Sequence, residues 1–175
     1  MHLTSSNDLA PEVRLVITSI AKQLSSLLPR AEFHHIGATA IPGAVTKGDV
    51  DVLLRVEASD FLSAVSALRG RFAIKQPENW TEVFASFGDD SSYQFPIGVQ
   101  LVVKDSEGDI FLFLHDYLTS DPKHLAEYNR VKRESAPNGP EAYWKAKDRY
   151  LSSILASRPK RANKALQATA GPAGS

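Results

Sequence analysis

The sequence contains no cysteine among its 175 residues, and this absence removes several kinds of chemistry at once. Thiolate catalysis, disulfide bonds and metal sites built on cysteine are all excluded. The chain also lacks an apolar run of the roughly 18–20 residues that a membrane span requires. Its first residues carry neither a basic flank nor an apolar segment, so no signal peptide is expected. These absences favour a cytoplasmic protein without a membrane partner.

Two widespread catalytic motifs are missing as well. The chain has no Gly-x-x-x-x-Gly-Lys-[Ser/Thr] loop, which excludes the ordinary P-loop kinases and ATPases. It has no Gly-x-Ser-x-Gly sequence either, which disfavours hydrolases that carry their serine on a sharp strand-to-helix turn. Any phosphate chemistry in this protein must therefore rest on a different arrangement of residues.

An excess of charge of one sign is absent too, because 20 basic residues balance 20 acidic ones. The last 18 residues contain no acid and four basic residues, Arg158, Lys160, Arg161 and Lys164. Residues 1–157 are thus left with a formal charge of −4, which disfavours a nucleic-acid partner because such partners usually meet a basic face. The tail has too few large apolar residues to bury a core. We expect a single domain at 1–157 and a disordered tail at 158–175.

Hydrophobic periodicity predicts the order of elements in this domain. Apolar residues three and four positions apart predict helices at 9–28 and 59–69, with Asn7 or Asp8 as the first N-cap. Alternating or continuous apolar runs predict strands at 31–36, 48–56, 71–75, 81–87, 92–95 and 98–104. Pro122 is expected to begin a helix after Asp121, following a shorter helix and preceding another after 138–140. This order predicts a mixed α/β or α+β domain with a helical C-terminal portion.

The stretch that indicates chemistry most directly holds two aspartates one residue apart. Because side chains alternate along a strand, Asp49 and Asp51 project to one side while Val50 and Val52 project to the other. Two neighbouring carboxylates are costly unless a cation or several donors neutralise them. Proteins usually hold Mg²⁺ with one or two carboxylates together with substrate phosphates. The pair is therefore a candidate Mg²⁺ site, and the alternative is the polar face of an edge strand paired with nearby basic residues.

A turn rich in small residues precedes this strand. Gly37, Ala38 and Thr39 are candidates for phosphate contact, because such turns let the backbone approach a ligand closely. Backbone geometry alone is the alternative for the glycine, and a turn-stabilising hydrogen bond is the alternative for Thr39. Lys47 either neutralises phosphate charge or pairs with a neighbouring aspartate.

Two segments of the chain resemble the GrpB family of the nucleotidyltransferase superfamily. The first runs from His35 to Gly43 and continues with Lys47 and Asp51, similar to the family's Ile-Gly-Ser-Thr-Ser-Val-Pro-Gly-Leu…Lys…Asp-Ile. The second begins with His-Asp-Tyr-Leu at 115–118 and continues with Tyr128, Lys132, Tyr143 and Lys147. Together they span roughly residues 10–155. The resemblance implies the polymerase-β-like nucleotidyltransferase fold, a mixed sheet flanked by helices with metal-binding acids on the strand after the glycine turn.

The sequence departs from the resembled pattern at three positions. Ala38 stands where the family has a serine that would help to hold a phosphate, and Asp49 occupies a position that is often apolar. The superfamily's third carboxylate should fall on a later strand, where the chain offers Gln100. A neutral amide cannot act as a general base. The other candidates for a third acid are Glu82, Asp89, Asp90 and Asp116.

The acidic pair and the resemblance together predict Mg²⁺-dependent transfer of a nucleotidyl group from a nucleoside triphosphate to an unidentified acceptor. Asp49 and Asp51 would be the catalytic and metal-binding residues. The expected phosphate contacts are Gly37, Ala38, Thr39, Lys47, Lys132 and Lys147. Two alternatives are a catalytically impaired nucleotide-binding or protein-interaction module on the same fold, and a structural partner protein that binds no nucleotide. Tyr128 and Tyr143 are interpreted as packing residues with satisfied hydroxyls.

Overall fold

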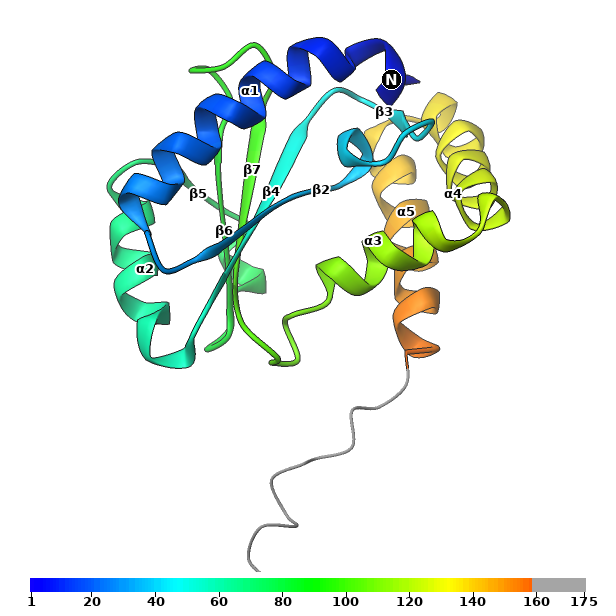
Figure 1. Ribbon diagram of the computed structural model, residues 1–175. Coiled ribbons are helices and arrows are strands. Elements are labelled where there is room, and N and C mark those ends of the chain that lie inside the picture. Colours follow the sequence, from blue (N-terminus) through cyan, green and yellow to red (C-terminus); the bar gives the residue numbers. More distant parts are fainter. Residues whose placement is uncertain (159–175) are drawn as a thin grey trace, which may run out of the picture.

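The computed structural model describes residues 1–158, which build a five-stranded mixed sheet with helices on both faces (Figure 1). Its strands lie in the order β2 (Glu32–Ile36), β4 (Val50–Val56), β7 (Ile97–Val103), β6 (Phe84–Asp89) and β5 (Ala73–Lys75). β4 pairs with β7 in parallel, and the other three pairings are antiparallel. Near the N-terminus, β1 (Thr4–Ser5) and β3 (Val45–Thr46) form a separate two-residue ladder.

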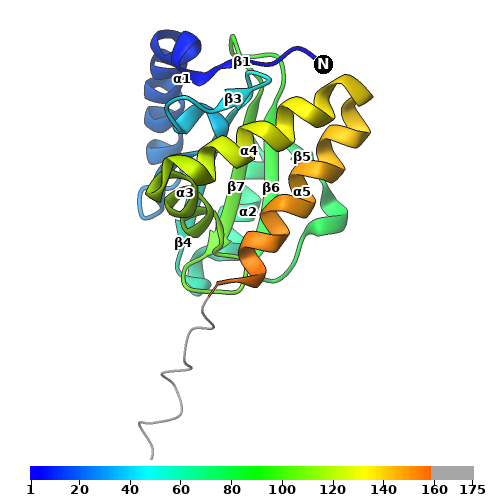
Figure 2. The same cartoon turned by 90° about the vertical axis from the view of Figure 1, so that its right-hand side faces the viewer.

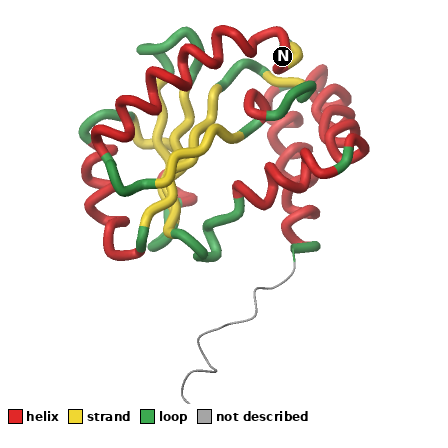
Figure 3. The backbone as a smooth tube through the Cα atoms, in the orientation of Figure 1, coloured by secondary structure: helices red, strands yellow, loops and turns green. Residues whose placement is uncertain are grey.

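Two helices cover one face of the sheet and three lie on the other side (Figure 2). α1 (Ser6–Leu27) and α2 (Phe61–Arg69) bury their apolar sides in the main core. α3 (Phe111–Ser120), α4 (Pro122–Ser135) and α5 (Pro140–Ala156) form the helical C-terminal portion, which shares a second core with Ile41 and Ala44 from the segment after β2. Single 3-10 turns occur at Ala38–Ala40, Ala58–Asp60, Pro77–Asn79 and Ala136–Asn138. Figure 3 shows the strands between these two groups of helices, which confirms the predicted mixed architecture.

β4 is an interior strand, buried on both faces. Val50 and Val52 are fully buried on the α1 and α2 side, and Leu53 is fully buried on the opposite side. The strand lies between β2 and β7, so its backbone is hydrogen-bonded along both edges. The alternative of an edge strand with a polar outer face is therefore wrong. The two aspartates are instead at the end of a strand covered by helices.

The structure confirms the helix predicted to begin at Pro122. The side chain of Asp121 caps it, because its Oδ1 accepts a hydrogen bond from the backbone N–H of Lys123 at 2.8 Å. The strand predicted at 92–95 does not form. The backbone N–H groups of Ser91 and Ser92 both donate to Asp89 Oδ1 at 2.9 Å, so the chain turns at this point rather than extending.

The N-terminal prediction needs a second correction. α1 begins at Ser6, and Ser5 is its N-cap, since the Ser5 hydroxyl accepts a hydrogen bond from Asn7 N–H at 3.3 Å. Asn7 and Asp8, the predicted caps, lie inside the helix. The helix begins earlier than predicted because residues 4 and 5 are extended and pair with β3. No local sequence pattern indicates this β1–β3 ladder.

No helix within residues 1–158 combines the length and apolar character of a membrane span. Arg158, the first residue of the predicted tail, donates a hydrogen bond to the backbone carbonyl of Asp109 at 3.2 Å. The central carbon of its guanidinium lies 5.4 Å from the ring centroid of Phe113. The rest of the predicted tail lies outside the described residues.

Candidate functional site

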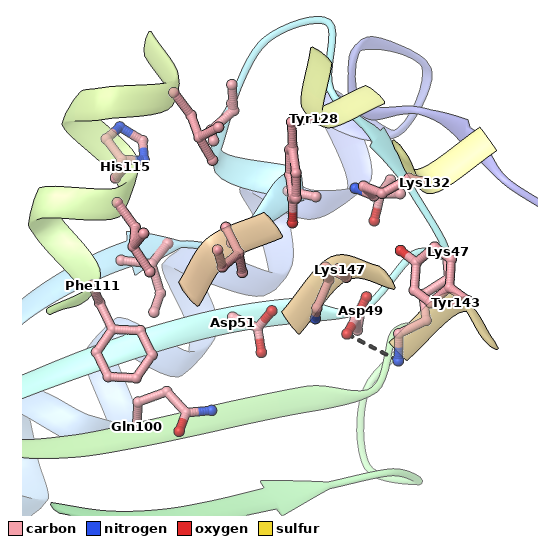
Figure 4. A pocket seen from close by; sticks show the side chains of 18 residues that line it. Lys47, Asp49, Asp51, Gln100, Phe111, His115, Tyr128, Lys132, Tyr143 and Lys147 are labelled. Carbon is pink, nitrogen blue, oxygen red and sulfur yellow. Dashed lines mark ion pairs between the residues drawn. The ribbon is translucent and has the colours of Figure 1, made fainter. Parts of the chain in front are cut away.

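A cavity of about 200 Å³ opens between the end of β4 and the helices α3, α4 and α5 (Figure 4). Asp51 and Gln100 line it from the sheet, Asp49 lines it from the segment just before β4, and Lys132 and Lys147 reach it from α4 and α5. Gly37, Ala38 and Lys47 border it from the turn and the segment after β3. The structure thus brings together all of the predicted metal-binding and phosphate-contacting residues except Thr39.

Asp51 lies in a notch made by two glycines. Its neighbours across the sheet are Ile36 on β2 and Gly98 on β7. A Cβ atom added at Gly98 would lie 2.3 Å from Asp51 Oδ1, and one added at Gly37 would lie 2.6 Å from Asp51 Oδ2. Gly37 also has a φ of +75°, which favours glycine. Both positions have to remain without a side chain if the carboxylate is to keep its place.

The environment of Asp51 favours its uncharged form in the absence of a ligand. Burial, followed by the negative charge of Asp49, raises the pKa of Asp51 to about 7, while Lys147, Lys47 and Lys132 oppose this shift. Within residues 1–158 the Asp51 side chain has no hydrogen bond and no ion pair. A buried carboxylate without such partners destabilises the fold unless a proton or a cation neutralises it.

Asp49 has a partner, unlike Asp51. The ammonium of Lys47 lies 3.0 Å from Asp49 Oδ2, so the alternative of an ion pair with a neighbouring aspartate is realised. Lys47 Nζ also lies 4.6 Å from the ring centroid of Trp144, and Lys147 Nζ lies 4.2 Å from the same centroid. One indole ring therefore holds two of the cavity's ammonium groups, and it does so by cation–π attraction.

Lys132 is almost completely buried, with 1% of its surface exposed. Its ammonium donates to the backbone carbonyl of Val45 and lies 4.5 Å from the ring centroid of Tyr128. Burial, followed by repulsion from Lys147, lowers the pKa of Lys132 to about 7. Burial likewise lowers the pKa of Lys147. The charged forms of both lysines are thus destabilised, and an anionic ligand in the cavity would stabilise them.

The segment between Gly37 and Thr46 is fixed by polar side chains from α1 and α4. Asn129 Oδ1 accepts from Val45 N–H at 2.8 Å, and Asn129 Nδ2 donates to the Gly43 carbonyl at 2.9 Å. The Ser6 hydroxyl donates to the Ile41 carbonyl at 2.7 Å. The position of the turn therefore depends on residues far away in the sequence.

We expect Asn129→Ala to lower the free energy of unfolding by about 2–3 kcal/mol, because it leaves the buried N–H of Val45 and the partly buried carbonyl of Gly43 without the Asn129 side chain as partner. Urea denaturation measures this change. Asn138→Ala is the matched control, since Asn138 is exposed and makes one long bond of 3.4 Å to the Glu134 carbonyl. An equally small effect of both substitutions would contradict the role of Asn129 in holding the turn.

Thr39 is the predicted site residue that the structure places elsewhere. Its hydroxyl donates to the Asp49 carbonyl at 3.2 Å and lies 3.1 Å from His35 Nε2. It faces a second cavity, next to α1, rather than the one that contains Asp51. Burial, followed by the charge of His115, lowers the pKa of His35 to about 4, so this imidazole is neutral at pH 7. The turn-stabilising alternative describes the contacts of Thr39.

None of the four sequence candidates for a third acid borders the cavity. Asp90 pairs with Lys75, and Asp89 caps a turn. Gln100 does border it, two residues after Gly98 on the same face of β7. Within the described part of the chain, no group of three or more histidine, aspartate or glutamate side chains is arranged to hold a metal ion. The site therefore contains two carboxylates and an amide.

The interpretation of Tyr128 and Tyr143 was wrong in one respect. Both residues are buried, as expected of packing residues, but neither hydroxyl forms a hydrogen bond within residues 1–158, and both side chains border the cavity. Sequence reasoning also missed Gly98 and Trp144. The spacing of four between each tyrosine and the following lysine is a signal that could have placed both hydroxyls beside the cavity.

The five-stranded mixed sheet flanked by helices has a nucleotidyltransferase-like architecture. The chain belongs to the GrpB family, since the family model described as "GrpB protein" matches residues 7–157. A UPF0157 protein of Vibrio cholerae is 28% identical over 133 residues, which cover 76% of this chain and 70% of that protein. The crystal structure of the conserved protein GrpB from Enterococcus faecalis is similar at a TM-score of 0.64 and 18% identity, covering 88% of this chain and 99% of that one.

A more distant likeness relates the fold to known enzymes. The Cid1 poly(U) polymerase with Mg 3'-dATP bound is similar at a TM-score of 0.52 and 15% identity. The match covers 82% of this chain but 49% of Cid1. At this level of identity the likeness concerns the fold alone, and it confirms the nucleotidyltransferase-like architecture.

Proposed function

We propose that the cavity binds a nucleoside triphosphate together with Mg²⁺, and that the protein transfers a nucleotidyl group to an acceptor. The observation that supports this most is the state of Asp51. Its carboxylate is held in a glycine notch, has no protein partner within residues 1–158 and borders a cavity that three lysines enter. Such an arrangement suits a site that receives a cation and phosphate groups at the same time.

The residues present are compatible with magnesium. Hard divalent cations prefer carboxylate oxygens, and Asp49 and Asp51 offer them from one side of the cavity. A bound cation would reverse the effect of burial on the pKa of Asp51, because it favours the charged carboxylate. When bound, Mg²⁺ would neutralise phosphate charge and make the α-phosphorus more electrophilic.

The chain's own residues would act by positioning and by balancing charge. Lys47, Lys132 and Lys147 face the cavity from three different segments and would offset the charge of the phosphates. An oxygen of the acceptor would form a bond to the α-phosphorus while the bond to the bridging oxygen breaks and pyrophosphate leaves. Gln100 cannot take a proton from the acceptor. A hydroxyl acceptor would therefore need a base other than Gln100, whereas an acceptor that is already anionic, such as a phosphate group, would need none.

A second candidate is a catalytically impaired module that binds a nucleotide and serves a regulatory or protein-interaction role. Gln100 in place of a third carboxylate and Ala38 in place of a serine favour this interpretation. Both candidates share the nucleotide site, and they differ only in whether the α-phosphate is attacked.

Calorimetric titration of the four ribonucleoside triphosphates with and without Mg²⁺, followed by a pyrophosphate-release assay across phosphate and hydroxyl acceptors, tests the proposal. We expect Mg²⁺ to tighten nucleotide binding by about tenfold or more, and pyrophosphate to appear with an anionic acceptor. Binding without release in every mixture would favour the impaired module. Absence of binding under all conditions would overturn both candidates.

A further inference from the structure

The same pair of residue types occurs twice on the helical side of the cavity, each time at a spacing of four. Tyr128 and Lys132 lie on α4, and Tyr143 and Lys147 lie on α5. A spacing of four places two side chains on one face of a helix. All four residues border the cavity, so each helix presents one phenol and one ammonium to it (Figure 4).

The two phenols are built into the protein interior. Tyr128 is 6% exposed and Tyr143 is 3% exposed, and within residues 1–158 neither hydroxyl has a hydrogen-bond partner. Figure 4 shows the Tyr128 hydroxyl directed toward the space between Asp51 and Lys147. Both hydroxyls open onto the cavity rather than into the packed interior, so a ligand in the cavity can supply the acceptors that the described part of the protein does not.

The charges that line the cavity favour binding of an anion, even without a metal ion. Lys47, Lys132 and Lys147 face two aspartates, so the lining has an excess of positive charge when all five groups are ionised. Lys132 and Lys147 also repel each other, and after burial this repulsion is the second cause that lowers the pKa of Lys132. An anion between the two helices would meet two ammonium groups and two hydroxyl donors.

We propose that the two Tyr–Lys pairs form a diphosphate site, in which each pair binds one of two adjacent phosphate groups, and that this binding requires no metal ion. The proposal rests on the proposed function and narrows it, since it assigns the terminal phosphates of the nucleotide, and the pyrophosphate product, to α4 and α5. Burial raises the pKa of both tyrosines, that of Tyr143 to about 12, so both hydroxyls stay protonated and donate. Charge-assisted hydrogen bonds of this kind are among the strongest in proteins.

The test uses the whole chain in buffers passed over a chelating resin, with inorganic phosphate, pyrophosphate and tripolyphosphate as ligands in calorimetry. We expect pyrophosphate to bind at least about tenfold more tightly than phosphate, since one pair serves phosphate and both serve pyrophosphate. Equal affinities for phosphate and pyrophosphate, or no binding of pyrophosphate without a metal ion, would overturn the proposal.

Tyr128→Phe and Tyr143→Phe remove one hydroxyl each and keep the ring. We expect each to weaken pyrophosphate binding about tenfold while the melting temperature stays the same or rises, because the lost hydroxyl makes no hydrogen bond within residues 1–158. Tyr150→Phe is the matched control. Its hydroxyl donates to the His124 carbonyl at 3.3 Å, and its ring stacks on Tyr128 outside the cavity lining. It should lower stability and leave pyrophosphate affinity unchanged.

The outcomes separate this proposal from the nucleotidyl transfer on which it builds. Metal-free pyrophosphate binding that depends on both phenols, in a protein that never releases pyrophosphate from nucleotides, would support the diphosphate site and contradict transfer. Nucleotide transfer that survives both Tyr→Phe substitutions with unchanged pyrophosphate affinity would contradict the diphosphate site alone. In that case Lys132→Met and Lys147→Met, compared with the exposed Lys145→Met on α5, would show whether the lysines bind the phosphates by themselves.

Discussion

The Asp51→Asn variant is expected to lose Mg²⁺-dependent nucleotide binding and to unfold at a higher temperature than the unaltered protein. The loss follows because Asp51 is the one acid of the pair without a protein partner within residues 1–158, and an amide is a far weaker ligand for a hard cation. We expect affinity for the Mg²⁺–nucleotide complex to fall about 100-fold or more. Calorimetric titration with and without Mg²⁺ measures this change.

The gain in stability follows from the electrostatics of the same carboxylate. Burial and the charge of Asp49 both oppose ionisation of Asp51, and an amide removes both costs. We expect a gain of about 1–3 kcal/mol, less than the whole pKa difference implies, because water reaches the carboxylate through the cavity. Asp116→Asn is the control, since Asp116 is an exposed carboxylate on α3 outside the cavity lining. Nucleotide binding that survives in Asp51→Asn would remove the metal role of Asp51.

The stability difference should also depend on pH, in buffer free of divalent metal. The pKa of Asp51 is about 7 in the folded protein, whereas an aspartate in an unfolded chain has a pKa of about 4. Between these values the folded protein keeps a proton that the unfolded chain has lost, so the unaltered protein loses stability as pH rises from about 4 to 7. Asp51→Asn lacks this loss, so the stability of the variant relative to the unaltered protein should increase from about pH 4 to pH 7. Thermal unfolding of both proteins at several pH values measures this difference. An advantage that is constant with pH would contradict the raised pKa.

We expect Gly37→Ala and Gly98→Ala to weaken nucleotide binding nearly as much as Asp51→Asn does. Unlike Asp51→Asn, both are expected to destabilise the fold. Each new methyl group would overlap an oxygen of Asp51, at 2.6 Å and 2.3 Å respectively. Because the two glycines flank the carboxylate, a rotation away from one moves it toward the other. We expect a loss of about 2–4 kcal/mol in unfolding free energy for Gly37→Ala, where the positive φ adds strain. Chemical denaturation and Mg²⁺–nucleotide titration measure the two effects.

Gly43→Ala is a control that separates the backbone strain of a positive φ from the steric clash with Asp51. Gly43 also has a positive φ, of +80°, but the nearest atom to its added methyl group is Leu125 Cδ2 at 3.9 Å. It should cost about 1 kcal/mol and leave nucleotide binding unchanged. In an Asp51→Ala background, Gly98→Ala should lose most of its effect, because the atom that it meets is gone. Additive costs in this double variant would show that the notch does not act through Asp51.

The fold was predictable where local pattern and burial agree. The alternation from Asp49 to Val56 placed the aspartates on one face and the valines in the core, because β4 is an interior strand that pairs with β2 and β7 and is buried. The start of α4 was predictable because Asp121 and Pro122 act within a single turn. The short strand at 92–95 was not, since one side chain, that of Asp89, draws the following N–H groups into a turn.

The parts of the site that escaped prediction depend on contacts distant in sequence. Trp144 holds Lys47 and Lys147 together, although Lys47 lies nearly a hundred positions away from both. Gly98 matters only because the β4–β7 register sets it opposite Asp51. Thr39 lies away from the cavity because the 3-10 turn at Ala38–Ala40 directs its hydroxyl to the Asp49 carbonyl. No local pattern carries this information.

Gln100 has a consequence for how this family can change over time. It stands on β7 beside the aspartates, at the edge of the same cavity. Codons for glutamine and glutamate differ by one nucleotide, so a single point mutation would supply a third acid to a scaffold that already orients the other two. Under the proposed function, this one change would separate a protein that holds a nucleotide from one that consumes it, with the surrounding architecture unaltered, and the reverse change is equally short.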